Sequence, residues 1–283
     1  MIWALVSTCI DAFASITRKK SLELNTYLSA YGFKILWMFG PLIFVPYFLF
    51  QNKYSFQKLN LGLIFAILCI CLVRIVSTNL SQYIYKNEKV TVLMPYENLN
   101  KVMSIIASFF LLWDGNIKTV WVAFIVIVIL LIASLDFQKI TFPQIFALLF
   151  LHESLTATRS ISTAYIIKML SSYVDYFIIE SGILILFLVI WTIVYKDLDK
   201  FSLMTKKFYS YRVFAGVLGT MSYVIGLYLI SSLGLVLTIL LSFLWITVKL
   251  ILWYFVLHDR VQIKNIFLAV TITGLVSLWF LVR

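Results

Sequence analysis

Long unbroken apolar segments constrain the fold of this chain more than any other feature. The run VWVAFIVIVILLIASL, from Val120 to Leu135, contains no charged residue, and similar runs recur along the sequence. A helix needs roughly 20 predominantly apolar residues to cross the hydrocarbon core of a bilayer. Strands of a membrane barrel would instead alternate polar and apolar residues. These runs therefore predict an all-α polytopic membrane protein.

The composition agrees with the apolar runs. Of the 283 residues, 63% are hydrophobic and 12% are charged, and the mean hydropathy is +1.01. A soluble domain carries about twice that share of charged residues. The connections between the apolar runs are short, so no soluble domain is expected. We predict ten transmembrane helices, at about residues 2–17, 27–50, 59–85, 89–112, 118–136, 142–168, 176–195, 209–230, 234–257 and 261–282.

The net charge of +11 and the three cysteines have simple explanations in a membrane protein. Lys and Arg accumulate in cytoplasmic loops of such proteins, so no nucleic-acid partner is expected. Cys9, Cys69 and Cys71 lie inside apolar runs, which favours small buried hydrophobic residues over metal ligands or disulfides. We predict no metal site and no cofactor.

The two halves of the chain resemble each other. The segment SFFLLWDGNIKTVWVAFIVIVILLIASL aligns with ILWYFVLHDRVQIKNIFLAVTITGLVSL, and each has a short turn with Asp114 or Asp259 between two apolar runs. The starts of the halves each carry an acid, Asp11 or Glu153. Because five helices make up each half, the second half is expected to insert in the opposite orientation. We predict two inverted five-helix repeats, residues 1–137 and 141–283, with a substrate site near the midplane.

This layout resembles the drug/metabolite transporter superfamily, specifically its EamA-like ten-helix members. In that family the fourth and ninth helices tend to end in a Gly-Glu-Arg-like turn, and WDG at 113–115 and HDR at 258–260 occupy that place. Lys34 lies where the second helix of the family often carries a basic residue, and Gly274 matches a small residue of the last helix. The resemblance implies a permease with ten helices.

The chain departs from the family pattern at two positions. A proline is usual about one helix length before each of those turns, and Lys101 and Ile246 occupy roughly those positions. Members of the family carry amino acids, other metabolites or drugs, so the resemblance leaves the substrate open.

Five of the predicted helices carry polar residues along one face. Side chains at positions i, i+3, i+4 and i+7 share a helix face. Charged residues at bilayer depth usually face the bundle interior or a water-filled cavity, and they mark functional sites. We therefore predict a polar cavity. The stripes consist of Ser7 and Asp11; Arg74, Ser77, Thr78, Ser81 and Tyr85; Glu97, Asn100, Lys101, Ser104 and Ser108; His152, Glu153, Thr156, Arg159, Ser160 and Thr163; and Thr238, Ser242, Trp245 and Lys249.

Structural explanations of the same residues stay open. Glu97 and Lys101 lie one helical turn apart and can neutralise each other. Arg74 can bind backbone carbonyl groups, and His152 can form a hydrogen bond between helices. Long basic side chains near the ends of the predicted helices are expected to extend to the membrane surface. These are Lys34, Lys168 and Arg212.

The polar stripes predict a secondary transporter that works by alternating access. Basic residues outnumber acids in the predicted cavity, which favours a small anionic or zwitterionic metabolite such as an amino acid or organic acid. The chain has no ATP-binding motif, and we expect neither an enzyme nor catalytic residues. We predict substrate binding by Arg74, Glu97, Asn100, Lys101, Glu153, Arg159, Trp245 and Lys249, and proton coupling by Asp11, Glu97, His152 and Glu153.

Two alternatives stay open. An exporter of cationic drugs or amines would use Glu97, Glu153 and Asp11, and a non-transporting scaffold or assembly protein would have no need of the stripes. The expected partners are a small-molecule substrate, the lipid bilayer and a coupling proton or ion. We expect a monomer or homodimer in the cell (inner or plasma) membrane. The greater number of Lys and Arg after odd-numbered helices puts both termini outside, whereas the family resemblance puts them in the cytoplasm.

Overall fold

A computed structural model of the chain describes most of the predicted helical segments. It covers residues 2–25, 27–51, 53–87, 99–112 and 143–242, with Trp121, Phe124, Ile125, Val128 and Thr271 as single residues. Every regular element within this part of the chain is a helix, which confirms the all-helical fold class. The predicted helices at 118–136 and 261–282 lie almost wholly outside the described residues.

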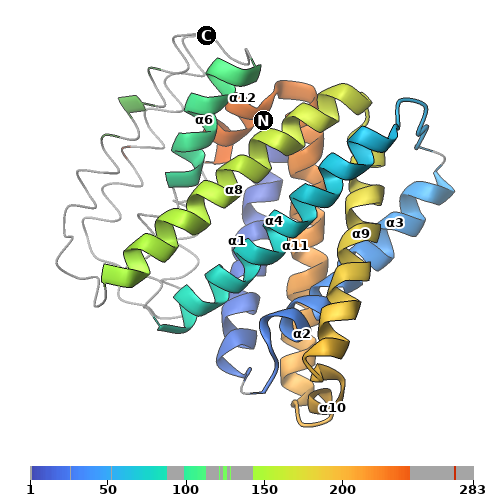
Figure 1. The fold of residues 1–283 in the computed structure, drawn as a ribbon, viewed down its shortest axis with the longest axis vertical. Coiled ribbons are helices and arrows are strands. Elements are labelled where there is room, and N and C mark those ends of the chain that lie inside the picture. Colours follow the sequence, from blue (N-terminus) through green and yellow to red (C-terminus); the bar gives the residue numbers. More distant parts are fainter. Residues whose placement is uncertain are drawn as a thin grey trace. The chain divides into compact units, whose positions relative to one another are not determined.

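Figure 1 shows the described helices as coiled ribbons. Four helical segments are long and apolar enough to cross a membrane, namely Ala30–Phe50, Leu61–Ile84, Tyr173–Val194 and Lys206–Leu233. The described elements are α1 (Ile2–Glu23), α2 (Ala30–Ile35), the 3-10 turn η1 (Leu36–Met38), α3 (Phe39–Phe50), α4 (Leu61–Asn87), α6 (Leu99–Leu112), α8 (Pro143–Leu170), α9 (Tyr173–Val194), α10 (Asp197–Phe201), α11 (Lys206–Leu233) and α12 (Leu235–Ser242).

The outer faces of these helices carry large apolar side chains. Phe50, Phe65, Phe110 and Leu186 are 88%, 66%, 69% and 61% exposed. A soluble protein rarely exposes so much apolar surface, whereas lipid tails accommodate it. This distribution is that of an integral membrane protein, as the composition predicts.

Some predicted helix boundaries were wrong. Helix α1 continues to Glu23 instead of ending near residue 17, and α11 begins at Lys206 instead of residue 209. Hydropathy marks only the part of a helix inside the hydrocarbon layer, whereas hydrogen bonding continues into the polar headgroup region. Lys20 lies in the last turn of α1, where a positive charge interacts favourably with the helix dipole.

The predicted helix at 27–50 is interrupted in the structure. The 3-10 turn η1 separates α2 from α3. Pro41, in the first turn of α3, lacks the N–H group that would bind the carbonyl of Trp37 in an α-helix. A 3-10 turn at this point is one way to accommodate that missing bond.

Contacts along the chain divide it into two compact units. The first unit contains Leu72–Tyr165 and Ser232–Arg283, together with Met1, and the second contains Ile2–Cys71 and Ile166–Ser231. Each unit takes residues from both predicted repeats. The repeat boundary near residue 140 therefore stays a prediction.

In the second unit, the segment Ala30–Phe50 lies antiparallel to α9. At one end, the ring of Tyr31 stacks on Trp191, with ring centroids 5.5 Å apart. At the other end, Phe48 packs edge-on against Phe177 at 5.9 Å. The early residue of one segment thus meets the late residue of the other, and the two helices form a tight pair.

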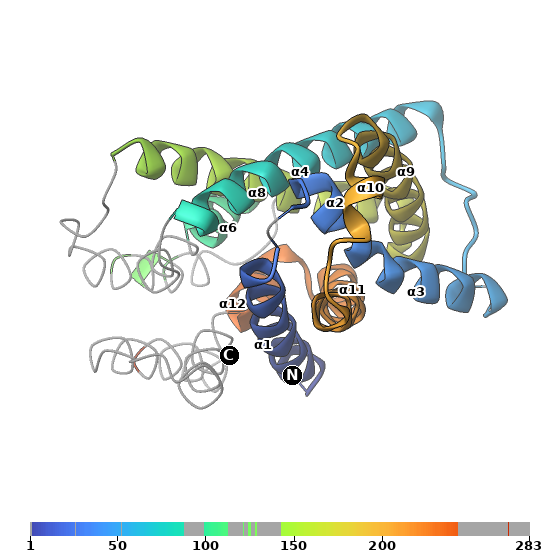
Figure 2. The same cartoon turned by 90° about the horizontal axis from the view of Figure 1, so that it is seen from below.

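Helices α1 and α11 form a second antiparallel pair in the same unit, side by side in both views (Figures 1 and 2). The hydroxyl groups of Ser7 and Ser222 lie 3.0 Å apart. Further along, the Lys20 Nζ lies 5.9 Å from the centroid of the Tyr211 ring. Hydrogen bonds between hydroxyl groups contribute to association of helices in membranes.

Glycine lets η1 and α3 approach α11 closely. A Cβ atom at Gly40 would meet the hydroxyl oxygen of Thr220 and would lie 2.6 Å from the carbonyl oxygen of Gly216. A Cβ atom at Gly216 would lie 2.8 Å from the carbonyl oxygen of Trp37. Small residues at both positions therefore permit this contact, as is common in membrane proteins.

Candidate functional site

The second half of α4 turns its polar stripe towards the protein. Arg74 is 6% exposed, and Ser77 and Ser81 are also buried. On the opposite face, Val76 and Tyr83 are exposed. Because a charged side chain is expensive inside a membrane, the burial of Arg74 indicates polar neighbours in the interior.

Helix α6 has the same distribution of polar and apolar residues. Ser104 and Ser108 are buried, whereas Phe110 and Leu111 are exposed. Ser108 donates a hydrogen bond to the carbonyl of Ser104, which satisfies its hydroxyl group within the helix.

Two residues of the predicted binding set lie near the start of α6. Asn100 and Lys101 are half-buried. The Nζ of Lys101 donates to the carbonyl oxygen of Ser242 on α12, 3.4 Å away. Lys101 therefore connects two helices of the first unit.

Helix α8 contributes an acid and a histidine. Glu153 is 1% exposed, and its Oε1 lies 2.9 Å from the Nδ1 of His152, which is half-buried. When His152 is protonated the contact is an ion pair, and when it is neutral the ring can donate a hydrogen bond. Such a pair can hold and release a proton.

Two contacts join these three helices. The hydroxyl groups of Ser77 on α4 and Thr156 on α8 lie 3.4 Å apart. The hydroxyl of Ser154 on α8 lies 3.7 Å from the sulfur of Met103 on α6. We call the buried polar residues of these three helices the α4–α6–α8 face; they are Arg74, Ser77, Ser81, Ser104, Ser108, Glu153 and Thr163.

Six described residues of the predicted site belong to the first unit. Glu97, Trp245 and Lys249 lie outside the described residues, and Asp11 is half-buried on α1 in the second unit. The six in the first unit are Arg74, Asn100, Lys101, His152, Glu153 and Arg159. The family turns at 113–115 and 258–260 also lie outside the described part of the chain.

Metal ligands do not gather in this part of the protein. Within the described residues, no three His, Cys, Asp or Glu side chains are close enough to hold a metal ion. Cys9 and Cys69 are exposed, whereas Cys71 is buried. The prediction that all three are buried was therefore wrong for two of them, because thiols on the lipid-facing side of a helix need no protein cover.

The second unit buries four charged residues that the sequence analysis did not assign to a site. Asp175, Glu180, Asp197 and Arg212 are each at most 1% exposed. Asp175 accepts hydrogen bonds from the backbone N–H groups of Ser55 and Phe56, at 3.1 and 3.0 Å. Asp175 therefore fixes the segment that leads into α4.

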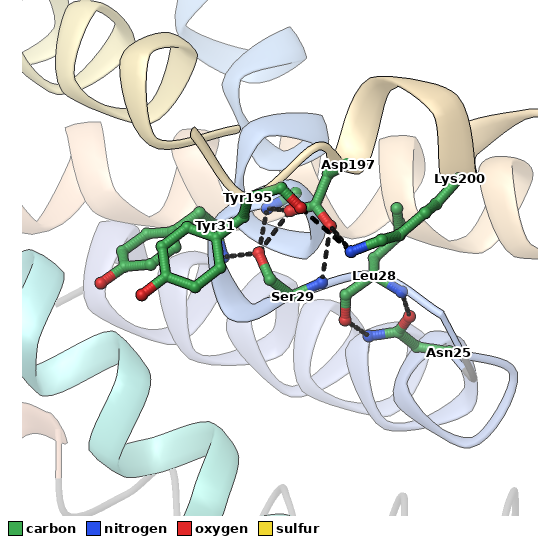
Figure 3. Close-up of polar contacts among 8 residues, drawn as sticks. Asn25, Leu28, Ser29, Tyr31, Tyr195, Asp197 and Lys200 are labelled. Atoms are coloured by element: carbon green, nitrogen blue, oxygen red, sulfur yellow. Dashed lines mark hydrogen bonds and ion pairs between the residues drawn. The ribbon is translucent and has the colours of Figure 1, made fainter. Parts of the chain in front are cut away.

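Asp197 plays the same part at the other end of α9 (Figure 3). Its carboxylate accepts hydrogen bonds from the backbone N–H groups of Ser29 and Gly32, at 3.0 and 3.1 Å, and from the Nζ of Lys200 at 3.2 Å. A negative charge at the first turn of α2 is favourable because the N–H groups there have no partner within the helix. Asp175, near the start of α9, thus binds the segment that follows α3. Asp197, just after the end of α9, binds the segment that precedes α2.

Glu180 lies within the membrane-spanning segment Tyr173–Val194. Its Oε2 accepts a hydrogen bond of 2.6 Å from the hydroxyl of Tyr223 on α11. The signal was present in the sequence, since Glu180 is an acid inside the apolar run FIIESGILILF. An ionisable residue at that depth is a candidate functional residue by default.

The location of the Arg212 side chain also differs from the prediction. Its guanidinium was expected to extend to the membrane surface, but the residue is 1% exposed and contacts Phe33 of α2. Lys34 also lies against an aromatic ring, with its Nζ 4.4 Å from the centroid of Trp37. Both cations therefore lie against aromatic rings of the protein.

Comparison with known proteins identifies the fold only. No protein family and no curated protein matches the chain. A solved structure described as "Crystal structure of protein" is similar over 99% of this chain and 96% of its own length, with a TM-score of 0.65 and 10% sequence identity. The fold therefore recurs, over nearly its whole length, in a protein of very different sequence.

Proposed function

We propose that this protein is a secondary transporter that moves a small anionic or zwitterionic metabolite across the cell membrane by alternating access. The observation that carries the proposal is the α4–α6–α8 face, where Arg74 and Glu153 are buried, as are serine and threonine residues of the same helices. Helices that only anchor a scaffold in lipid have no need of buried charges, which are costly at that depth.

The proposed architecture is ten transmembrane helices in two inverted five-helix repeats, as in the drug/metabolite transporter superfamily. The antiparallel packing of Ala30–Phe50 against α9 supports this architecture. These segments are the second helices of the two proposed repeats, and an inverted repeat gives equivalent helices opposite directions.

The proposed substrate class follows from the charges near the α4–α6–α8 face. Arg74, Lys101 and Arg159 supply cations, and Lys249 is the proposed counterpart from the second repeat. Guanidinium and ammonium groups bind carboxylates through charge-assisted hydrogen bonds, with Arg able to do so through two parallel bonds. A neighbouring acid such as Glu153 can receive the amino group of a zwitterion or carry a coupling proton.

Uptake into liposomes tests the proposal. Purified protein is reconstituted and offered radiolabelled amino acids and organic acids one at a time, with protein-free liposomes as the blank. We expect saturable uptake of at least one of them. A charged hydrogen bond contributes about 1.5–3 kcal/mol, so Arg74→Gln, Lys101→Ala or Lys249→Ala should lower kcat/KM by about tenfold or more.

A matched control separates binding from folding. Lys168 is an exposed lysine on α8, and Lys168→Ala should leave uptake unchanged. Normal uptake by folded Lys101→Ala and Lys249→Ala variants would rule out the anion site. Transport of organic amines in place of anions would instead support the cationic exporter, which the deep burial of Glu153 favours.

A further inference from the structure

Arg212 is a buried cation that the proposed transport mechanism does not use. It belongs to the membrane-spanning segment Lys206–Leu233 of the second unit and is 1% exposed. Its Nε donates a hydrogen bond of 2.7 Å to the carbonyl oxygen of Phe33. That carbonyl lies in the last turn of α2, where the change to a 3-10 turn leaves backbone acceptors in need of partners.

The aromatic ring of Phe33 covers one face of the Arg212 guanidinium. The Cζ of Arg212 lies 3.9 Å from the centroid of the Phe33 ring, within the range of a cation–π contact. Phe208 packs on the same ring, with centroids 6.2 Å apart. The cation is thus enclosed by apolar groups on this side.

The hydrogen-bonding capacity of Arg212 is only partly used. A guanidinium carries five N–H donors, and one of its two terminal nitrogens has no hydrogen-bond partner in the described part of the chain. No described carboxylate forms an ion pair with it. A buried charge without a compensating partner is strongly destabilising.

The nearby charge that acts on Arg212 is also positive. Arg18, half-buried on α1, acts electrostatically on Arg212. The Nζ atoms of Lys20 and Lys207 lie 5.9 and 6.0 Å from the centroid of the Tyr211 ring. This end of the α1–α11 pair therefore carries several positive charges, and a negative group at Arg212 would supply the missing hydrogen bonds.

We propose that Arg212 and Arg18 bind a phosphate group, either free phosphate or the headgroup of an anionic lipid. The planar fork of arginine matches a phosphate group through paired hydrogen bonds, and basic pockets between transmembrane helices bind anionic headgroups. Arg212 follows the first residue of α11, Lys206, by roughly 9 Å at 1.5 Å per residue. That depth is close to the boundary between headgroups and hydrocarbon. Because Arg212 is enclosed, the phosphate group must displace the side chains around it.

Thermal unfolding of the full-length protein tests this site. In neutral detergent, inorganic phosphate is titrated against chloride at equal ionic strength. In nanodiscs, phosphatidylcholine alone is compared with phosphatidylcholine plus phosphatidylglycerol. A ligand that binds only the folded protein raises the midpoint of unfolding with increasing concentration. We expect such a rise for the wild type, its loss in Arg212→Gln and a smaller rise in Arg212→Lys.

Controls make each outcome decisive. Lys206→Gln removes an exposed charge from the same end of α11 and should keep the full rise. A rise with phosphate in detergent assigns the site to a soluble anion, and a rise only with phosphatidylglycerol assigns it to lipid. No rise with either, or an equal rise in wild type and Arg212→Gln, overturns the proposal. If Arg212→Gln does not fold, Arg18→Gln is titrated instead, and an unchanged apparent affinity has the same meaning.

Discussion

Asp197 accepts hydrogen bonds from both the backbone N–H and the hydroxyl group of Ser29, a residue that precedes it by 168 positions. The same hydroxyl group accepts hydrogen bonds from the N–H groups of Tyr31 and Gly32, at 3.2 and 3.3 Å. Ser29 is therefore the N-cap of α2 and Asp197 holds the cap in place (Figure 3). This arrangement ties the start of one membrane-spanning segment to the end of another.

Replacement of Asp197 by asparagine should destabilise the protein. An amide keeps one acceptor oxygen but loses the charge, and hydrogen bonds to a charged group contribute about 1.5–3 kcal/mol each. We expect a loss of about 2 kcal/mol in the free energy of unfolding, measured by thermal or denaturant unfolding in detergent. Asp199→Asn is the control, because Asp199 is exposed on the same short helix. Equal stability of the two variants would contradict the capping role.

Asp175→Asn should loosen the segment before α4. The Asp175 carboxylate binds the N–H groups of Ser55 and Phe56, and Phe56 has the unfavourable φ of 48° for a residue with a side chain. Asparagine has one acceptor oxygen in place of two, so one of these backbone hydrogen bonds is lost and the conformation at Phe56 is less stable. Trypsin should therefore cut faster after the exposed Lys53 and Lys58. Limited proteolysis followed by mass spectrometry measures the rate. Glu23→Gln, at an exposed acid on α1, should be cut at the wild-type rate.

Gly40→Ala should be destabilising, because the new methyl group would collide with Thr220 and with the carbonyl oxygen of Gly216. Overpacking of this kind costs about 1–3 kcal/mol. Gly182→Ala makes the same chemical change in α9, where a Cβ atom would meet nothing within 4 Å. Thermal unfolding of the two variants should therefore separate them, and a Gly40→Ala variant as stable as Gly182→Ala would show that α3 and α11 approach less closely.

Among the described residues, the existence of the long helices and the burial of the polar residues on α4 could be predicted from the sequence. Both depend on local patterns, namely apolar runs of membrane-spanning length and a polar repeat of three or four residues. The pattern placed Arg74 and Ser77 on one face of α4, and the structure buries both. Val76, which falls outside that pattern, is exposed.

The partners of Asp175 and Asp197 could not be predicted in this way. Each aspartate lies at a helix end, where a solvated residue is the ordinary expectation, and each binds backbone groups more than a hundred residues away. No local repeat in the sequence indicates a contact between residues so far apart. The hydropathy profile also misses η1, because Pro41 and Gly40 change the backbone without changing the apolar character of the run.

The hydrogen bond between Tyr223 and Glu180 should appear as a coupling energy between α9 and α11. The two atoms are 2.6 Å apart and Glu180 is buried, so removal of either partner leaves the other without this bond. Tyr223→Phe and Glu180→Gln should each lower stability, and the double variant should lose less than their sum. We expect a coupling of about 1–3 kcal/mol in a double-mutant cycle, and a value near zero would contradict the bond.

Glu153 is the proposed carrier of the coupling proton. His152 and Glu153 are adjacent on α8 and in direct contact at 2.9 Å, and Glu153 is buried on the α4–α6–α8 face. A proton bound by Glu153 on one side of the membrane and released on the other would drive uptake against a concentration gradient. The charge of Glu153 changes in that cycle, whereas glutamine cannot ionise.

Glu153→Gln should therefore abolish the response of uptake to a pH gradient while leaving exchange of labelled for unlabelled substrate across the same liposomes. His152→Gln removes the ring that lies 2.9 Å from the carboxylate and should reduce the uptake that an imposed pH gradient drives. The measurement is uptake with and without an imposed gradient over a range of pH. Glu23→Gln, an exposed acid on α1, is the control and should follow the wild type. Accumulation against a gradient by folded Glu153→Gln would exclude this carboxylate as the proton carrier.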